Sequence, residues 1–220
     1  MDILFKILLV LHIAGGGTGL ITGAVNMARP KGDKTHKLIG NVFMYSMLTA
    51  ACMALLLSII HPNSFLFIVG IFTIYLTATG RRYLYFKNAA PGGGPQILDW
   101  ILSIAMIATS FIFIGMGAWY LFRSNNFGIV FIVFGILGLR LGRADIFNYQ
   151  GRSEIKNYWL TGHLQRMAGS YIAAVTAFEV VNWKYLPLAL PGYVSWLLPT
   201  VLLVPLIVIW TRKYQVLVKN

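Results

Sequence analysis

Seven long apolar runs, separated by short polar breaks, dominate the pattern of hydrophobic and polar positions along the chain. They occupy residues 3–27, 38–60, 64–84, 97–122, 126–142, 162–183 and 193–211. Several exceed the roughly 18 residues that distinguish a membrane span from a buried core helix. Continuous apolar runs favour helices over a membrane β-barrel, whose strands alternate in polarity. We therefore predict an all-α integral membrane bundle of about seven transmembrane helices, forming one domain over residues 1–220.

The breaks contain residues that stop helices. Proline and glycine fill 91–95, which we interpret as a flexible connector, and Pro187 and Pro191 precede the seventh run. Segment 143–161 is the one long break of mixed character. It fits a cytoplasmic interfacial segment or a solvated connector equally well.

The basic residues separate by side when successive breaks are assigned to alternating faces of a membrane. All but three of the 18 Lys and Arg residues fall on one side, the exceptions being Lys6, Arg123 and Lys184. By the positive-inside rule the basic side is cytoplasmic. The amino terminus is then outside and the carboxyl terminus in the cytoplasm, and we expect a bacterial plasma (inner) membrane protein with anionic lipid head groups on its cytoplasmic side.

Composition agrees with a lipid environment. The chain is 58% hydrophobic and 11% charged, with a mean hydropathy of +0.72, whereas soluble domains carry about 25% charged residues. The net charge of +12 lies in clusters that anchor spans, so we do not expect nucleic-acid binding.

The first run is too long for a cleaved signal peptide, and the single cysteine, Cys52, excludes an intrachain disulfide.

Polar residues inside the spans are the first candidates for function. His12, Gly16, Gly19, Gly23 and Asn26 share one helical stripe, and the Gly15, Gly19, Gly23 spacing is typical of close helix packing. His12 is then either a packed, hydrogen-bonded residue or a ligand or proton-handling group. Glu179 could meet His12 in the outer half of the membrane or reach the outer interface.

The predicted cytoplasmic ends hold a denser set of candidates. His36 and His163 lie at the same depth among Arg81, Arg82 and Arg166, and Arg166 shares a helix face with His163. An imidazole pair can ligate haem iron or a transition metal, and arginines can neutralise propionates. A metal site shared by His36 and His163 requires spans 2 and 6 to bring these side chains within about 5 Å. Sequence motifs for hydrolases, zinc proteases, c-type haem and phosphate-binding loops are absent.

The chain resembles a family of uncharacterised bacterial multi-pass membrane proteins, grouped as a predicted-membrane-protein domain of unknown function. The resemblance covers about residues 5–180 and is carried by His12 with its glycines and by the stretches 35–40 (THKLIG), 80–82 (GRR) and 163–167 (HLQRM). It implies a helical plasma-membrane protein in which His12, His36 and His163 matter, and no established activity. Histidines at span ends also resemble those of transmembrane b-type cytochromes, although His36 and His61 are too far apart for haems stacked on one helix.

Three functions follow as hypotheses. The first is a haem or metal bound by inward-facing histidines, for electron transfer. The second is a carrier or channel for a small solute, ion or proton, with Thr22, Thr73, Thr77 and other polar residues along its path and span 7 kinked at Pro199 and Pro205. The third is a structural or assembly role without chemistry.

Overall fold

The computed structural model describes residues 3–88, 94–185 and 192–217, and within these ranges the chain is helical with no β-strand. The seven α-helices are α1 (Ile3–Ala28), α2 (Lys34–Ile60), α3 (Ser64–Tyr83), α4 (Ile97–Phe122), α5 (Gly128–Tyr149), α6 (Tyr158–Asn182) and α7 (Gly192–Tyr214). Short 3₁₀ turns extend α3 (Leu84–Asn88) and α6 (Trp183–Tyr185). The all-α prediction is confirmed.

Most boundaries lie close to the predicted runs, and the fifth is wrong. The fifth run was expected to end at 142, but α5 continues to Tyr149, so the long break expected at 143–161 shrinks to the residues between Tyr149 and Tyr158. The reason is Asp145, whose charge suggested an exit to water. Its carboxylate is instead buried and paired inside the bundle. Residues 91–93, Pro187 and Pro191 fall outside the described ranges, so the expectations for them stay untested.

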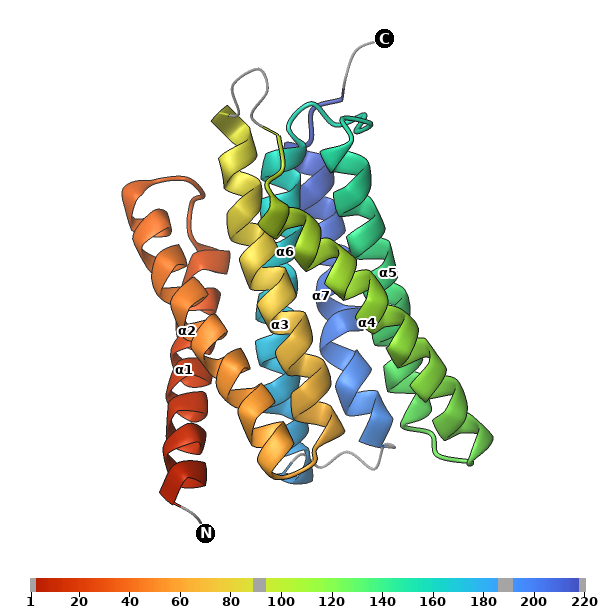
Figure 1. Ribbon diagram of the computed structural model, residues 1–220. Coiled ribbons are helices and arrows are strands. Elements are labelled where there is room, and N and C mark those ends of the chain that lie inside the picture. Colours follow the sequence, from red (N-terminus) through yellow and green to blue (C-terminus); the bar gives the residue numbers. More distant parts are fainter. Residues whose placement is uncertain (1–2, 89–93, 186–191, 218–220) are drawn as a thin grey trace.

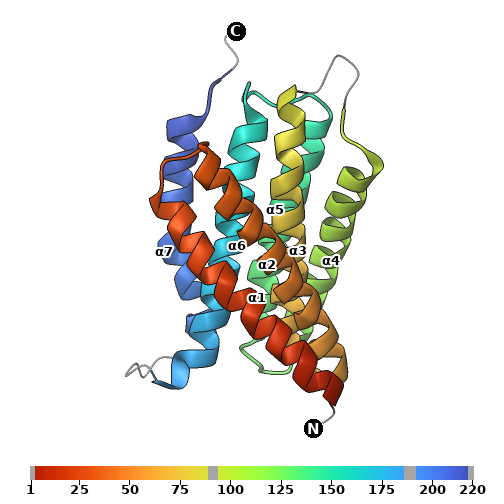
Figure 2. The same cartoon turned by 90° about the vertical axis from the view of Figure 1, so that its left-hand side faces the viewer.

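Helices α3 and α6 pack against each other and occupy the middle of the bundle (Figure 1). The α1–α2 pair packs on one flank through α2 against α3, and the α4–α5 pair lies on the other; α7 packs against α6. Seen from the side, α1 and α2 cross in front of the central helices (Figure 2). Successive helices run in opposite directions. The carboxyl-terminal ends of α1, α3, α5 and α7 therefore lie at one end of the bundle, which is also the end of the carboxyl terminus.

The apolar core lies between α3, α4 and α5. Phe72, Phe113 and Phe131 form its aromatic centre, and Phe113 and Phe131 have no exposed surface. Glycines let α4 and α5 approach closely: a Cβ on Gly117 would lie 2.7 Å from the carbonyl oxygen of Gly128. Small residues at helix contacts are the usual means of packing helices within lipid.

The turn between α1 and α2 is closed by side chains. Lys31 Nζ donates to the carbonyls of Asn26 and Met27 in the last turn of α1, at 2.6 and 2.8 Å. Asp33 caps α2, because its carboxylate accepts a 2.6 Å hydrogen bond from the backbone N–H of His36. That bond, followed by the pairing with Arg29, holds the pKa of Asp33 below its usual value.

Four helices are long and apolar enough to cross a membrane: α1, α2, α4 and, from Val194, α7. This supports an integral membrane protein. Helices α3, α5 and α6 do not meet that criterion, and they carry the buried polar residues Tyr75, Asp145 and Arg166. Part of the polarity of these helices comes from buried groups that pair with one another, such as Asp145 with Arg166.

Candidate functional site

His163 is held by the last turn of α3. Its Nδ1 lies 2.8 Å from the carbonyl oxygen of Gly80, one of the last four carbonyls of α3, which lack a partner within the α-helix. A carbonyl oxygen can only accept, so Nδ1 must carry the proton. The neutral ring then keeps its lone pair on Nε2. Ligand histidines commonly have this arrangement, with one ring N–H given to a carbonyl and the other nitrogen free to bind.

Two of the other predicted residues lie at the same end of the bundle as His163. They are His36, at the start of α2, and Arg81, near the end of α3. The Nδ1 atom of His36 is buried and has no hydrogen-bond partner among the described residues. Arg81 forms no ion pair within that part of the chain, and its guanidinium lies 5.9 Å from the Tyr85 ring. We call His36, Arg81 and His163 the histidine site; they come from α2, α3 and α6 at one end of the bundle.

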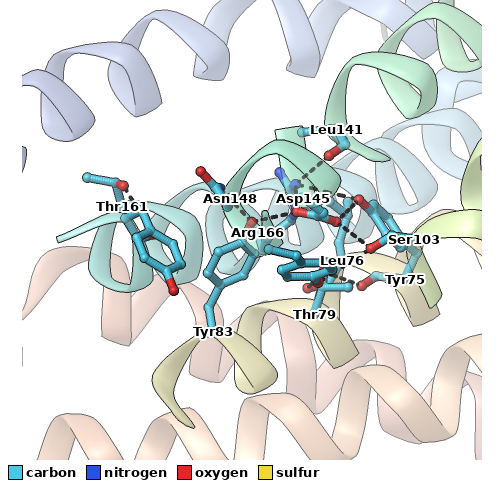
Figure 3. Close-up of polar contacts among 12 residues, drawn as sticks. Tyr75, Leu76, Thr79, Tyr83, Ser103, Leu141, Asp145, Asn148, Thr161 and Arg166 are labelled. Atoms are coloured by element: carbon cyan, nitrogen blue, oxygen red, sulfur yellow. Dashed lines mark hydrogen bonds and ion pairs between the residues drawn. The ribbon is translucent and has the colours of Figure 1, made fainter. Parts of the chain in front are cut away.

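Arg166 forms an ion pair with Asp145. Its side chain is 1% exposed, and Nη2 lies 2.5 Å from Oδ1 of Asp145, which is fully buried (Figure 3). The same nitrogen donates to the carbonyl of Leu141 at 2.9 Å. We expected Arg166 to serve an anionic ligand together with His163. That expectation needs correction, because Asp145 already neutralises the Arg166 charge.

Asp145 is the centre of a buried hydrogen-bond network joining four helices (Figure 3). Its carboxylate accepts from Tyr75 and Tyr83 of α3, the latter at 2.6 Å, and from Ser103 of α4 at 3.1 Å, besides Arg166 of α6. Asn148, one turn along α5, donates to the Tyr83 hydroxyl at 2.9 Å. The Arg166 guanidinium also lies over the Tyr75 and Tyr83 rings, at 5.6 and 5.8 Å. We call this set the Asp145 network.

Arg82 also forms an ion pair with a buried carboxylate, that of Asp99. Its Nε and Nη2 donate to the two oxygens of Asp99 at 2.7 and 2.8 Å, a two-pronged geometry favoured by arginine. Asp99 is fully buried and also accepts from the backbone N–H of Gln96, so it caps α4. Arg82 therefore joins α3 to the start of α4. Of the two adjacent arginines, only Arg81 has no acidic partner in the described structure.

His12 lies apart from the histidine site, on α1. Its Nδ1 donates to the carbonyl of Ala50 on α2 at 2.8 Å, which agrees with the packed, hydrogen-bonded interpretation; the interpretation as a ligand or proton-handling group stays a prediction. By the same argument as for His163, its neutral ring keeps the lone pair on Nε2.

The other two intramembrane candidates are Asn26 and Glu179. Asn26 Nδ2 donates to the carbonyl of His36 at 3.2 Å, so it joins α1 to α2. The Oε1 atom of Glu179 is buried without a partner in the described structure, and no hydrogen bond joins Glu179 to His12 there.

Sequence reasoning missed most of the Asp145 network. Asp145 falls in the break of mixed character expected at 143–161, and Tyr75, Tyr83 and Ser103 were not singled out. One signal was present: Asp145 and Asn148 are three residues apart, so on a continued helix they share a face. That signal would have extended α5 into the bundle.

The donor set can be tested against a metal or a haem. The described residues contain no group of three or more His, Cys, Asp or Glu side chains suited to a metal ion. The histidine site offers two imidazoles and one unpaired guanidinium. Two imidazoles suffice as axial ligands of haem iron, and the guanidinium suits a propionate.

Comparison of the chain with models of protein families, with curated proteins and with solved structures found no match. Function must accordingly be argued from the geometry of these sites.

Proposed function

We propose that all seven helices cross a bacterial plasma membrane, with the amino terminus outside, the carboxyl terminus in the cytoplasm and anionic lipid head groups around the cytoplasmic end. The arrangement of basic and aromatic side chains supports this. Lys31 lies over Trp210, Lys87 over Trp159 and Lys213 over Tyr214 at the end where the carboxyl terminus lies. At the opposite end Arg123 lies over Trp119. Aromatic and basic residues of this kind mark the two faces of a membrane.

Within this frame we infer that the protein binds haem at the histidine site, for electron transfer. The observation that carries the proposal is the hydrogen bond from His163 Nδ1 to Gly80, because it leaves Nε2 as a nitrogen ligand. His36 is the second imidazole, and its unpartnered Nδ1 supports a role beyond packing. When bound, haem supplies a one-electron redox centre; the protein residues hold and orient it.

The charge of the site supports an acidic ligand. Arg81 has no acidic partner in the described structure, and the two histidines, which are neutral as ligands, do not offset its charge. A haem propionate would supply the missing negative charge. Arg166 and Arg82, which sequence alone could not distinguish from Arg81, are excluded from that role by Asp145 and Asp99.

Absorption spectroscopy tests the proposal. Protein purified after expression with haem and transition metals supplied should show a Soret band and about one haem per chain. His163→Ala and His36→Ala should each lose or shift the band. His61→Ala is the matched control, because His61 lies beyond α2 at the opposite end and contacts Phe5. A colourless, metal-free wild-type protein would rule the proposal out.

A carrier or channel is the second candidate, and one observation favours it. Thr77 shares a 2.7 Å hydrogen bond with Ser170 across the α3–α6 contact. The hydroxyl of Thr73, one helical turn away, is buried without a described partner. Buried hydroxyls of this kind can hold water. Flux of protons, ions and metabolites into proteoliposomes should then depend on Thr73, and Thr73→Val should reduce it. No flux across such a panel would leave haem binding or a structural role.

A further inference from the structure

His163 and Arg166 stand one helical turn apart on the same face of α6. Residues three apart are neighbours on a helix surface, so whatever holds Arg166 also limits the rotation of α6 at His163. Both side chains meet α3: His163 through Gly80, and Arg166 through the Asp145 network that includes Tyr75 and Tyr83.

Gly80 brings the two helices into direct contact at this level. A Cβ added at Gly80 would lie 3.0 Å from Cβ of Arg166 and 3.2 Å from Sδ of Met167. The ring of His163 therefore reaches the Gly80 carbonyl only while the α6 backbone stays against this glycine. A small rotation or shift of α6 would break the 2.8 Å hydrogen bond.

The Asp145 carboxylate holds both helices at once. It accepts from Arg166 of α6 and from Tyr75 and Tyr83 of α3, which lie on either side of Gly80 in sequence. Buried ion pairs are weak stabilisers, since apolar residues of similar size often serve as well. What such a pair supplies is directionality, because its donors and acceptors tolerate few arrangements.

We propose that Asp145, acting through Arg166, is the positioning residue that keeps the His163 ring hydrogen-bonded to Gly80 with Nε2 free as a ligand. This inference rests on the proposed haem site for its functional meaning. Its structural content, the coupling of Asp145 to the protonated nitrogen of His163, can be measured without any cofactor.

The test replaces the ion pair by apolar residues of similar size, in the double variant Asp145→Leu with Arg166→Met. The matched control removes the other buried ion pair, with Asp99→Leu and Arg82→Met, which leaves α6 untouched. Two properties are measured in each: the ¹⁵N spectrum of the His163 ring, which reports which nitrogen carries the proton, and the dissociation constant for added haem. Circular dichroism checks that the helices are intact.

In the wild type and in the control we expect a single His163 form protonated at Nδ1. In the Asp145→Leu, Arg166→Met variant we expect a mixture of both tautomers and a haem dissociation constant at least tenfold higher. An unchanged ring spectrum in that variant would overturn the inference. If the wild type binds no haem while the double variant still loses the single tautomer, the proposed function fails and the positioning role stands.

Arg166→Lys covers the case in which the double variant does not fold. Lysine keeps the charge but loses the planar guanidinium, whose Nη2 donates to both Asp145 and the Leu141 carbonyl and which lies over the Tyr75 and Tyr83 rings. It should fold and show a partial loss of the Nδ1 form; retention of the full wild-type ring spectrum would again overturn the inference.

Discussion

At the scale of single residues, the adjacent arginines Arg81 and Arg82 show how far the same side chain can differ in role. Arg82 donates to both oxygens of Asp99, a carboxylate with no exposed surface. Arg81 has no acidic partner in the described structure. Their environments therefore predict opposite consequences for the same substitution.

Arg82→Gln should destabilise the protein, because it leaves the buried Asp99 carboxylate without its cation. We expect the free energy of unfolding to fall by about 2–3 kcal/mol, measured by denaturant or thermal unfolding in detergent. Arg81→Gln is the matched variant. It should leave stability within about 0.5 kcal/mol of wild type and weaken haem binding. The reverse pattern would show that the two arginines have been assigned the wrong roles.

The residue-scale predictions from sequence were partial for a physical reason. Depth along a span can be read from sequence, so His36, His163 and the arginines were placed at one end. Which way a side chain turns between neighbouring helices cannot. Arg166 looked like a ligand residue until its partner was known, and that partner, Asp145, lies on a helix whose contact with α6 no local pattern indicates.

At the scale of elements, close helix contacts depend on particular glycines. The predicted Gly15, Gly19, Gly23 spacing is confirmed as a packing surface. A Cβ added at Gly15 or Gly19 would contact α2, and one added at Gly23 would contact both α2 and α6. Gly16, which was placed on the stripe with His12, has nothing within 4 Å. The angle of about 100° per residue therefore predicted the packing face of α1 with an error of one position, since Gly15 and not Gly16 makes the contact.

Gly15→Ala and Gly16→Ala form a matched pair on α1. At Gly15 the new methyl would lie 2.8 Å from the backbone carbonyl oxygen of Ser46, which cannot turn aside, so we expect a loss of about 1–3 kcal/mol. At Gly16 the space is open, and the helix should gain about 0.5–1 kcal/mol. Apparent melting temperatures in one detergent measure both. Equal shifts for the two variants would contradict the close α1–α2 contact.

Gly80→Ala and Gly169→Ala test the α3–α6 contact in the same way. The Gly80 methyl would press on Cβ of Arg166 at 3.0 Å, whereas the Gly169 methyl would make an ordinary 3.4 Å contact with Leu76. We expect Gly80→Ala to lower stability by about 1 kcal/mol and to weaken the His163 hydrogen bond, seen in the ring ¹⁵N spectrum. Gly169→Ala should leave the ring spectrum unchanged and should not lower stability; an altered ring spectrum there would locate the sensitive contact elsewhere.

At the scale of the whole molecule, the helices differ in how apolar they are. The four helices that are apolar enough to span a membrane alone, α1, α2, α4 and α7, include much of the exposed apolar surface. Helices α3, α5 and α6 hold more than half of the buried polar side chains among the described residues, including Thr77, Asp145 and Arg166. Pairing of this kind agrees with a bundle in lipid, since intramembrane charges must face a partner inside the protein.

The seven-span topology gives the last prediction, which concerns the alternation of the connections. If every helix crosses the membrane, sites after odd-numbered helices lie in the cytoplasm, where the positive-inside rule places the basic residues. Reporter fusions should report cytoplasm after Lys34, Asn88, Lys156 and Asn220, and the exterior after Asn63, Asn125 and Lys184. Paired reporters, one active only outside and one only inside, control for poor expression at each site. If α3, α5 and α6 did not cross, consecutive sites would report the same side, and any two sites on the wrong side would break the seven-span arrangement.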